Sequence, residues 1–146
     1  MSISESSTHT PAELLQNATT IAVVGFSSDP SKPSHTAPME LVNRGWTVIP
    51  VHPKAAEVAG LTAYPSLADI PVKVDLVDVF RPSAEAAGIA RQAVEIGAGA
   101  LWLQQGITSS EAREIASEAG MAFIEDECAG ATAARQSLRP ATSPGQ

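Results

Sequence analysis

The sequence predicts an α/β fold: a single Rossmann-like, doubly wound domain with a mainly parallel five-stranded sheet. Short apolar and β-branched runs alternate with helical stretches along most of the chain. These runs are apolar almost throughout, which is typical of parallel strands that helices cover on both faces. The chain has 146 residues, a length that suits one domain with a continuous core.

Five apolar runs are the expected strands. They cover residues 20–26, 46–51, 74–80, 98–103 and 121–126. Helices are expected over residues 36–45, 83–97 and 109–120, with a short helical turn at 65–71. In a doubly wound sheet the carboxyl ends of the strands meet at one edge, and ligands bind there, near the point where the strand order reverses.

Capping residues predict where the helices begin and end. Ser83 is the expected N-cap of the second helix, and either Ser109 or Ser110 is the expected N-cap of the third. Gly45 follows the first helix as its C′ residue. Pro38 is expected to lie within the first turn of that helix, because a proline is tolerated only there.

Composition and the chain ends limit the class of partner. The 16 acidic and nine basic residues give a net charge of −7, so no nucleic-acid partner is expected. The start lacks the pattern of a signal peptide, and no apolar run approaches the roughly 20 residues of a membrane helix. We expect a cytoplasmic protein with no membrane partner. Its expected parts are a flexible tail at 1–11, a domain at 12–137 and a flexible tail at 138–146.

The loop after the first strand, "GFSSDPSKPSH", offers groups that suit a diphosphate. It lacks the G-x-G-x-x-G pattern of dinucleotide-binding loops, but Gly25 lets the backbone turn close to a ligand. Ser27, Ser28 and Ser34 supply hydroxyls and free N–H groups, and Lys32 adds a positive charge. The alternative is a polar surface loop in which Ser34 caps the next helix.

The turn after the second strand, "VHPK", carries Lys54 where an NAD-binding fold usually has an acid. That acid accepts hydrogen bonds from the ribose hydroxyls, and it would repel a ribose that carries a phosphate. Lys54 therefore favours NADP, with its 2′-phosphate, or coenzyme A (CoA), with its 3′-phosphate. The alternative is that Lys54 is an ordinary solvated lysine.

Two further strand ends carry candidate binding groups. Phe80 could pack against a purine or a pantetheine arm, and Arg81 could bind a phosphate. Alternatively, Phe80 belongs to the core and Arg81 caps a helix end. Gln104 and Gln105 precede Gly106, and their amides suit a ligand that itself contains amides.

None of the strand ends carries a convincing catalytic set. The sequence has no Ser-His-Asp order with a nucleophile elbow, no HExxH pattern and no paired metal ligands. His35 and His52 are isolated, which favours surface or ligand-contact roles. Asp78 is expected to be buried and to accept hydrogen bonds from loop N–H groups, and Trp102 is expected in the core.

In their order along the chain, six segments resemble the small stand-alone CoA-binding proteins of bacteria. The segments are "IAVVGFSSDPSKPSH", "GWTVIPVHPK", "YPSLADIP", "VDLVDVFRP", "IGAGALWLQQGI" and "AGMAFIEDEC". The resemblance runs from about residue 12 to residue 128. That family has a Rossmann-like fold, similar to the CoA-binding domain of the succinyl-CoA synthetase alpha subunit.

The resemblance implies a role for each strand end. Residues 25–28 would lie against the CoA diphosphate and ribose, and Lys54 would meet the nucleotide phosphate. The third strand end would border the adenine or the start of the pantetheine arm, and the fourth would line that arm. Two positions depart from the family, because His52 replaces a common Asn and Lys32 replaces a frequent Arg. The expected CoA-binding residues are Gly25, Phe26, Ser27, Ser28, Lys32, Ser34, Val51, His52, Pro53, Lys54, Val79, Phe80, Arg81, Leu103, Gln104, Gln105 and Gly106.

We expect a protein that binds CoA or an acyl-CoA and has no evident catalytic apparatus, because the strand ends carry binding groups but no convincing catalytic set. One alternative is an NADP-dependent reductase, although the glycine fingerprint is missing. Another is a detached subunit of an acyl-CoA synthetase, which would need a phosphohistidine domain and a nucleotide-binding partner. A homodimer or a partner enzyme subunit is compatible with the sequence. Cys128 lies at the ligand edge and either forms a mixed disulfide with the CoA thiol or is a partly buried structural cysteine.

Overall fold

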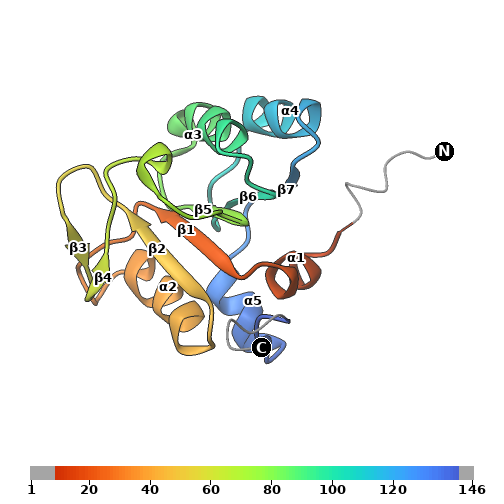
Figure 1. Ribbon diagram of the computed structural model, residues 1–146. Coiled ribbons are helices and arrows are strands. Elements are labelled where there is room, and N and C mark those ends of the chain that lie inside the picture. Colours follow the sequence, from red (N-terminus) through yellow and green to blue (C-terminus); the bar gives the residue numbers. More distant parts are fainter. Residues whose placement is uncertain (1–8, 142–146) are drawn as a thin grey trace.

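A parallel sheet of five strands lies between two layers of helices in the computed structural model, which describes residues 9–141 (Figure 1). The strand order is β2-β1-β5-β6-β7, and every neighbouring pair is parallel. The strands are β1 (Thr20–Val24), β2 (Thr47–Val51), β5 (Leu76–Val79), β6 (Ala100–Leu103) and β7 (Ala122–Ile124). This arrangement confirms the predicted Rossmann-like, doubly wound sheet.

The helices cover both faces of the sheet. On one face lie α1 (Pro11–Asn17), α2 (Pro33–Asn43) and α5 (Ala129–Arg135). On the other face lie α3 (Ser83–Glu95) and α4 (Ser110–Glu118), which pack against each other (Figure 1). Among residues 9–141, no helix has the length and hydropathy that crossing a membrane would require.

The apolar strands divide their side chains between two core clusters. In β1, Ile21 and Val23 pack on the side of α1, α2 and α5, whereas Ala22 packs on the side of α3 and α4. All four residues of β5 and all four of β6 are buried. Helices cover both faces, so nearly all successive residues are apolar, with the buried Asp78 of β5 as the exception, and the sequence shows this as nearly continuous apolar runs. Trp102 lies fully buried in the core, as predicted.

The helix ends confirm some of the expected caps and correct others. Ser109 caps α4 with a 3.0 Å bond from the Ala112 N–H to its Oγ, and Gly45 follows α2 with a φ of 109°. The expected N-cap Ser83 is wrong: Pro82 holds that position, and the Ser83 hydroxyl instead accepts from the Thr108 N–H.

Helix α2 begins earlier than predicted, at Pro33, and places Pro38 inside the helix. The N-cap is Lys32, so the alternative that Ser34 caps this helix is wrong. Pro38 has no N–H to offer the Ser34 carbonyl one turn before it. That carbonyl instead accepts a 3.0 Å hydrogen bond from the Ser27 N–H, which satisfies the oxygen and fastens the preceding loop to the helix.

Four short elements were not predicted. Helix α1 has a capping box in which Thr10 and Glu13 bond each other's backbone N–H groups. Strands β3 (Glu57–Val58) and β4 (Leu61–Thr62) form a hairpin beyond β2. Helix α5 is the fourth. Each of these elements has at most seven residues, so none is long enough to show a clear period in the sequence.

The expected tails fall mostly on residues 1–8 and 142–146, which lie outside the described part of the chain. Within the described part, helix α1 already begins at Pro11. At the other end Leu138 is buried, and the Ala141 N–H donates to the Gln16 carbonyl over 2.8 Å. Leu138 therefore packs on the domain and Ala141 bonds to it through its backbone, whereas the expected boundary at 137 stays a prediction.

Candidate functional site

The strand order reverses between β1 and β5, and a cleft opens at the carboxyl ends of the strands there. From β1 the chain continues outward to β2, whereas β5, β6 and β7 extend in the other direction. The cleft has a volume of about 710 Å³ and lies between the ends of β1, β2 and β5 and one side of α3. A smaller hollow of about 280 Å³ lies at the opposite, amino edge beside α1, where a doubly wound sheet does not place its ligand.

Most of the predicted site residues line this cleft. They are Gly25, Phe26, Ser27, Lys32, Ser34, Val51, His52, Pro53, Phe80 and Arg81. The others lie outside its lining: Ser28, Lys54, Val79, Leu103, Gln104, Gln105 and Gly106. Sequence reasoning had not named Val24, Pro65, Ser66, Glu85, Ile89 or Gln92, which also line it.

Gly25 brings two strand ends together. Its φ is +96°, and a Cβ atom added to it would lie 2.9 Å from the Phe80 carbonyl oxygen and 3.1 Å from the Arg81 Cδ. Both the backbone conformation and the close contact therefore require a glycine. The Phe80 N–H also donates to the Val24 carbonyl over 2.8 Å, so the ends of β1 and β5 are fixed relative to each other.

The loop between β1 and α2 is held in place by its own polar groups. Besides the bond from the Ser27 N–H to Ser34, the Nδ1 of His35 lies 2.7 Å from the Ser27 carbonyl oxygen. A carbonyl oxygen only accepts, so this nitrogen of His35 carries the proton. The His35 ring also meets the Phe26 ring edge-on, with centroids 5.7 Å apart. The loop is thus shaped before any ligand arrives.

A tight turn positions Lys32 at the mouth of the cleft. The Ser31 N–H and hydroxyl both donate to the Asp29 carboxylate, over 3.0 and 2.7 Å. These two bonds, with a smaller contribution from the positive charge of Lys32, lower the pKa of Asp29 below its ordinary value. Asp29 therefore stays ionised and keeps the turn closed, and Lys32 follows as an exposed side chain lining the cleft.

The His52 imidazole organises the turn after β2. Its Nδ1 accepts from the N–H groups of Lys54 and Ala55, each over 3.1 Å. An accepting Nδ1 carries no proton, so the ring is neutral and its proton is on Nε2. The Lys54 side chain is exposed and lies outside the cleft lining, two residues after His52.

The end of β5 contributes one ring and one ion pair. Phe80 is half-buried and lines the cleft. Arg81 donates from Nε and Nη2 to the two carboxylate oxygens of Glu85, over 3.0 and 2.8 Å. This bidentate pairing raises the pKa of Arg81 and lowers the pKa of Glu85. Glu85 was not predicted as a site residue, although its position four residues after Arg81 indicates such a pair.

The end of β6 takes no part in the cleft lining. Val79 and Leu103 are fully buried, whereas Gln105 and Gly106 are exposed. Gln104 is buried and donates its amide to Asp78. Asp78 is buried as predicted, but its partner is this side chain, so the expected bonds from loop N–H groups are wrong.

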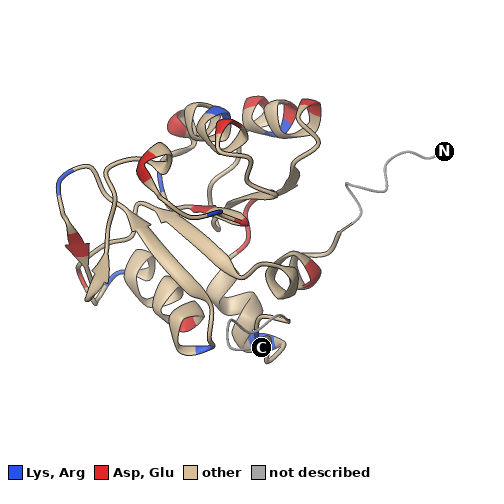
Figure 2. Cartoon of the chain, in the orientation of Figure 1, with Lys and Arg blue, Asp and Glu red and all other residues tan. Residues whose placement is uncertain are grey.

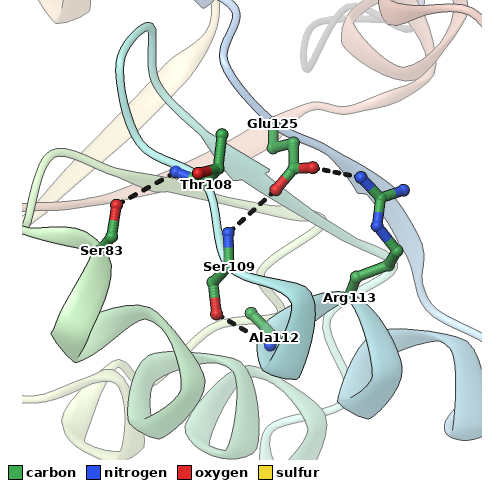
Figure 3. A network of polar contacts seen from close by, with 6 residues as sticks. All are labelled: Ser83, Thr108, Ser109, Ala112, Arg113 and Glu125. Carbon is green, nitrogen blue, oxygen red and sulfur yellow. Dashed lines mark hydrogen bonds and ion pairs between the residues drawn. The ribbon is translucent and has the colours of Figure 1, made fainter.

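A second group of polar residues joins the end of β7 and the beginning of α3 to α4 and the segment before it (Figure 3). The Glu125 carboxylate accepts from the Ser109 N–H over 3.0 Å and pairs with Arg113. The hollow beside them, of about 610 Å³, is lined by these three residues together with Thr108, Ser110 and Glu111. Since the polar groups drawn in Figure 3 bond one another, we assign them a structural role in holding α4 at the sheet edge.

Cys128 is a half-buried helix cap. Its Sγ accepts from the Ala131 N–H over 3.4 Å at the beginning of α5. It does not line the cleft. Among residues 9–141 there is no group of three His, Cys, Asp or Glu side chains that could hold a metal ion.

Comparisons with known proteins agree with this geometry. The model of a family described as "CoA binding domain" matches residues 19–134. The uncharacterized protein YneT of Bacillus subtilis (strain 168) is 38% identical over 116 residues, which cover 80% of this chain and 86% of YneT. The solved structure of ID.343 from Thermus thermophilus is 36% identical with a TM-score of 0.79, over 84% of this chain and 92% of that one.

A much longer protein contains a similar domain. Acetyl-coenzyme A synthetase 1 of Ca. Korarchaeum cryptofilum is 31% identical, with a TM-score of 0.69. The match covers 78% of this chain but 27% of the synthetase. The family model and the relative in B. subtilis each match most of the chain, and the chain therefore belongs to the family of CoA binding domains.

Proposed function

We propose that this chain binds CoA or an acyl-CoA in the cleft at the ends of β1, β2 and β5, and that it catalyses no reaction alone. The observation that carries the proposal is the position of Gly25 at the point where the strand order reverses. Gly25 has no side chain of its own, the stem of Arg81 packs against it, and Lys32 and Ser34 line the same cleft. Such a surface suits a diphosphate, and the volume of the cleft lies in the usual range for small-molecule sites.

Lys54 is proposed to bind the 3′-phosphate of CoA. Its side chain is exposed, and its backbone is fixed through the His52 imidazole at the rim of the cleft. A flexible lysine at a rim suits a phosphate at the outer end of a ligand, because the ammonium needs no fixed bonding geometry. This placement also separates the two phosphate positions, with the diphosphate near Gly25 and the 3′-phosphate near Lys54.

The proposed role without catalysis rests on the groups that line the cleft. The titratable side chains there are Lys32, His52, Arg81 and Glu85. The His52 Nδ1 is engaged by two backbone N–H groups, and Arg81 and Glu85 are engaged with each other. Among these four side chains no nucleophile lies beside a base, whereas covalent catalysis requires that arrangement. Among the described residues, the one lining hydroxyl seen to donate to a carboxylate is that of Ser66, which bonds the exposed Asp69 over 2.8 Å within its own helical turn.

Calorimetric titration tests the proposal directly. We expect CoA and acetyl-CoA to bind at micromolar concentrations or below, and NAD to bind weakly or not at all. Lys54→Ala should weaken CoA about tenfold and leave dephospho-CoA, which lacks the 3′-phosphate, nearly unchanged. Lys73→Ala is the matched control, because Lys73 bonds the Gly97 carbonyl at the other edge of the sheet. Equal losses for both ligands would show that Lys54 does not contact the 3′-phosphate, and failure of CoA to bind would refute the proposal.

A second candidate function is a subunit of an acyl-CoA synthetase. The similarity to a synthetase of which this chain matches 27% favours it. Such a subunit would deliver CoA to a partner chain that supplies the remaining domains. Purification of the tagged chain from its host, followed by an assay of acetyl-CoA synthesis, tests this role. If the chain purifies without a stoichiometric partner and the sample forms no acetyl-CoA, the result would argue against this role.

A further inference from the structure

We propose that Glu85 restrains Arg81 in the ligand-free cleft and thereby sets how tightly the cleft binds an organic diphosphate. This inference rests on the proposed function and adds a residue to it that sequence reasoning did not name. Arg81 would bind the diphosphate, and Glu85 would compete with the ligand for the guanidinium.

The two side chains form a close pair within the cleft. Arg81 is the second residue after β5, and Glu85 lies in the first turn of α3. Both guanidinium–carboxylate bonds are within 3.0 Å, and both residues line the cleft. Nearly half of each side chain is exposed (46% and 47%), so a ligand in the cleft has access to both. Their shifted pKa values, raised for Arg81 and lowered for Glu85, agree with a fully charged pair.

The Arg81 stem crosses the position proposed for the diphosphate. Its Cδ lies 3.1 Å from where a Cβ on Gly25 would be, so the stem packs directly on the bare backbone. The guanidinium lies beyond Cδ, and rotatable side-chain bonds join it to the backbone. A rotation of the side chain could therefore move the charge from Glu85 to an anion lying against the loop after β1.

The charges that line the cleft show how the ion pair weakens the binding of a diphosphate. Among the lining side chains, Lys32 and Arg81 are positive and Glu85 is negative. While the pair is closed, the carboxylate of Glu85 opposes the positive charge of the Arg81 guanidinium. A diphosphate must either displace Glu85 from the guanidinium or bind next to a carboxylate. Both alternatives weaken binding, and a ligand with little negative charge gains nothing from opening the pair.

An exposed ion pair is weak enough for a ligand to open. Pairs with this exposure typically change an equilibrium by less than about fivefold. An ionised diphosphate offers Arg81 a bidentate partner of higher charge than one carboxylate. The restraint therefore favours ligands with two linked phosphates over ligands with one, without preventing the binding of CoA.

The test compares Glu85→Gln with Glu111→Gln. Both acids lie in the first turn of a helix and pair with an arginine, and Glu111 pairs with Arg91 outside the cleft. Both substitutions change the net charge equally. We expect Glu85→Gln to tighten CoA, dephospho-CoA and inorganic pyrophosphate by a common factor of about three to five, and Glu111→Gln to change none of them. The gain should shrink as salt is raised from 0.05 to 0.5 M, since screening weakens the restraint.

The double variant shows whether Glu85 acts through Arg81. Arg81→Ala should lower the affinity for all three ligands. Adding Glu85→Gln to Arg81→Ala should raise the affinity by a smaller factor than Glu85→Gln does in the otherwise unaltered chain. A full gain without Arg81 would mean simple repulsion by Glu85 and would overturn the inference. So would unchanged binding of every ligand by Glu85→Gln. If pyrophosphate tightens but CoA does not bind, the proposed function fails and the restraint stands. If CoA binds the unaltered chain and Glu85→Gln has no effect, only the restraint fails.

Discussion

Asp78 is a fully buried carboxyl group with a single side-chain partner. Gln104, directly after the neighbouring strand β6, donates to the Asp78 Oδ1, and the Asp78 Oδ2 has no hydrogen-bond partner in the part of the chain that the structure describes. Burial in the core raises the pKa of Asp78 from 3.8 to about 7, and the bond from Gln104 opposes only part of that rise. At neutral pH this carboxyl group is therefore protonated in a large fraction of molecules.

Asp78 makes the stability of the fold depend on pH. The folded chain binds this proton more tightly than the unfolded chain, so the free energy of unfolding falls as the pH rises from about 4 to about 7 and then levels off. The loss from this one group is at most about 4 kcal/mol. In Asp78→Asn this fall should be absent, and the variant should be more stable than the unaltered chain at pH 8. Urea unfolding at several pH values measures it, with Glu57→Gln as control, because the Glu57 side chain in β3 is exposed. A fall of equal size in Asp78→Asn would assign the pH dependence to other groups.

At this scale the sequence predicts some residues well and others poorly. Gly25 could be predicted as a point of close approach, because a glycine directly after a parallel strand usually lets the backbone turn tightly against a neighbouring group. Gln104 could not be placed, because its role depends on which strand lies beside β6. Once β5 is the neighbour, Asp78 and Gln104 come within bonding distance, and the amide turns to the carboxylate instead of a ligand.

Helices α2 and α5 cross in close contact at Gly130. A Cβ on Gly130 would lie 2.7 Å from the Ala37 carbonyl oxygen and 2.9 Å from the Ala37 Cα. These are backbone atoms of a packed helix, so they cannot move aside without shifting α2. The glycine therefore sets the distance between the two helices and, through α2, the position of the loop that lines the cleft.

Replacing Gly130 by Ala should destabilise the fold by about 1–3 kcal/mol, because the added methyl group forces the helices apart. Gly88, in the exposed part of α3, has no atom within 4 Å of the corresponding Cβ position. Gly88→Ala should therefore stabilise the fold by up to about 1 kcal/mol, as expected for glycine in an open helix. Chemical denaturation of both variants checks the opposite signs. Stabilisation by Gly130→Ala would mean that the α2–α5 crossing tolerates a wider spacing.

The elements predicted correctly are those with strong local determinants. The buried strands and α4, with its Ser109 cap, follow from apolar runs and capping chemistry. The beginning of α2 was wrong because a proline normally marks a first turn. Here a bond from the Ser27 N–H to the Ser34 carbonyl, made across the loop, compensates for the bond that Pro38 cannot make. Local helix propensity cannot predict such a compensating bond, because the bond depends on how the loop folds.

The strand order of the whole sheet decides which strand ends share the cleft. The sequence correctly predicts five parallel strands whose carboxyl ends lie at one edge, but it does not state their order. In the order β2-β1-β5-β6-β7, the ends of β1, β2 and β5 are neighbours, and β6 lies one strand farther away. This explains why groups after β1, β2 and β5 line the cleft while Gln105 and Gly106 do not.

Figure 2 shows that β1 and β2 carry no charged residues, whereas acidic residues gather on α3 and α4.

Both ends of the described chain close the domain at the edge opposite the cleft. Helix α2 runs from the carboxyl edge of the sheet to the amino edge, and Arg44 at its end donates to the Leu138 carbonyl over 3.5 Å. The Leu138 side chain is 5% exposed and belongs to the core cluster of α1, α2 and α5. The Trp46 indole N–H donates to the Leu15 and Ala18 carbonyls, which joins the end of α1 to the beginning of β2.

Leu138→Ala should lower the free energy of unfolding by about 2–4 kcal/mol, because it leaves a cavity among three helices. Val72→Ala removes an apolar side chain that is 54% exposed and should change stability by no more than about 0.5 kcal/mol. The cleft lies at the other edge of the sheet, so the affinity of folded Leu138→Ala for CoA should equal that of the unaltered chain. Urea denaturation and calorimetric titration of the same samples measure both quantities. A lower CoA affinity of the folded variant would mean that repacking at the amino edge reaches the cleft through α2, which runs between the two edges.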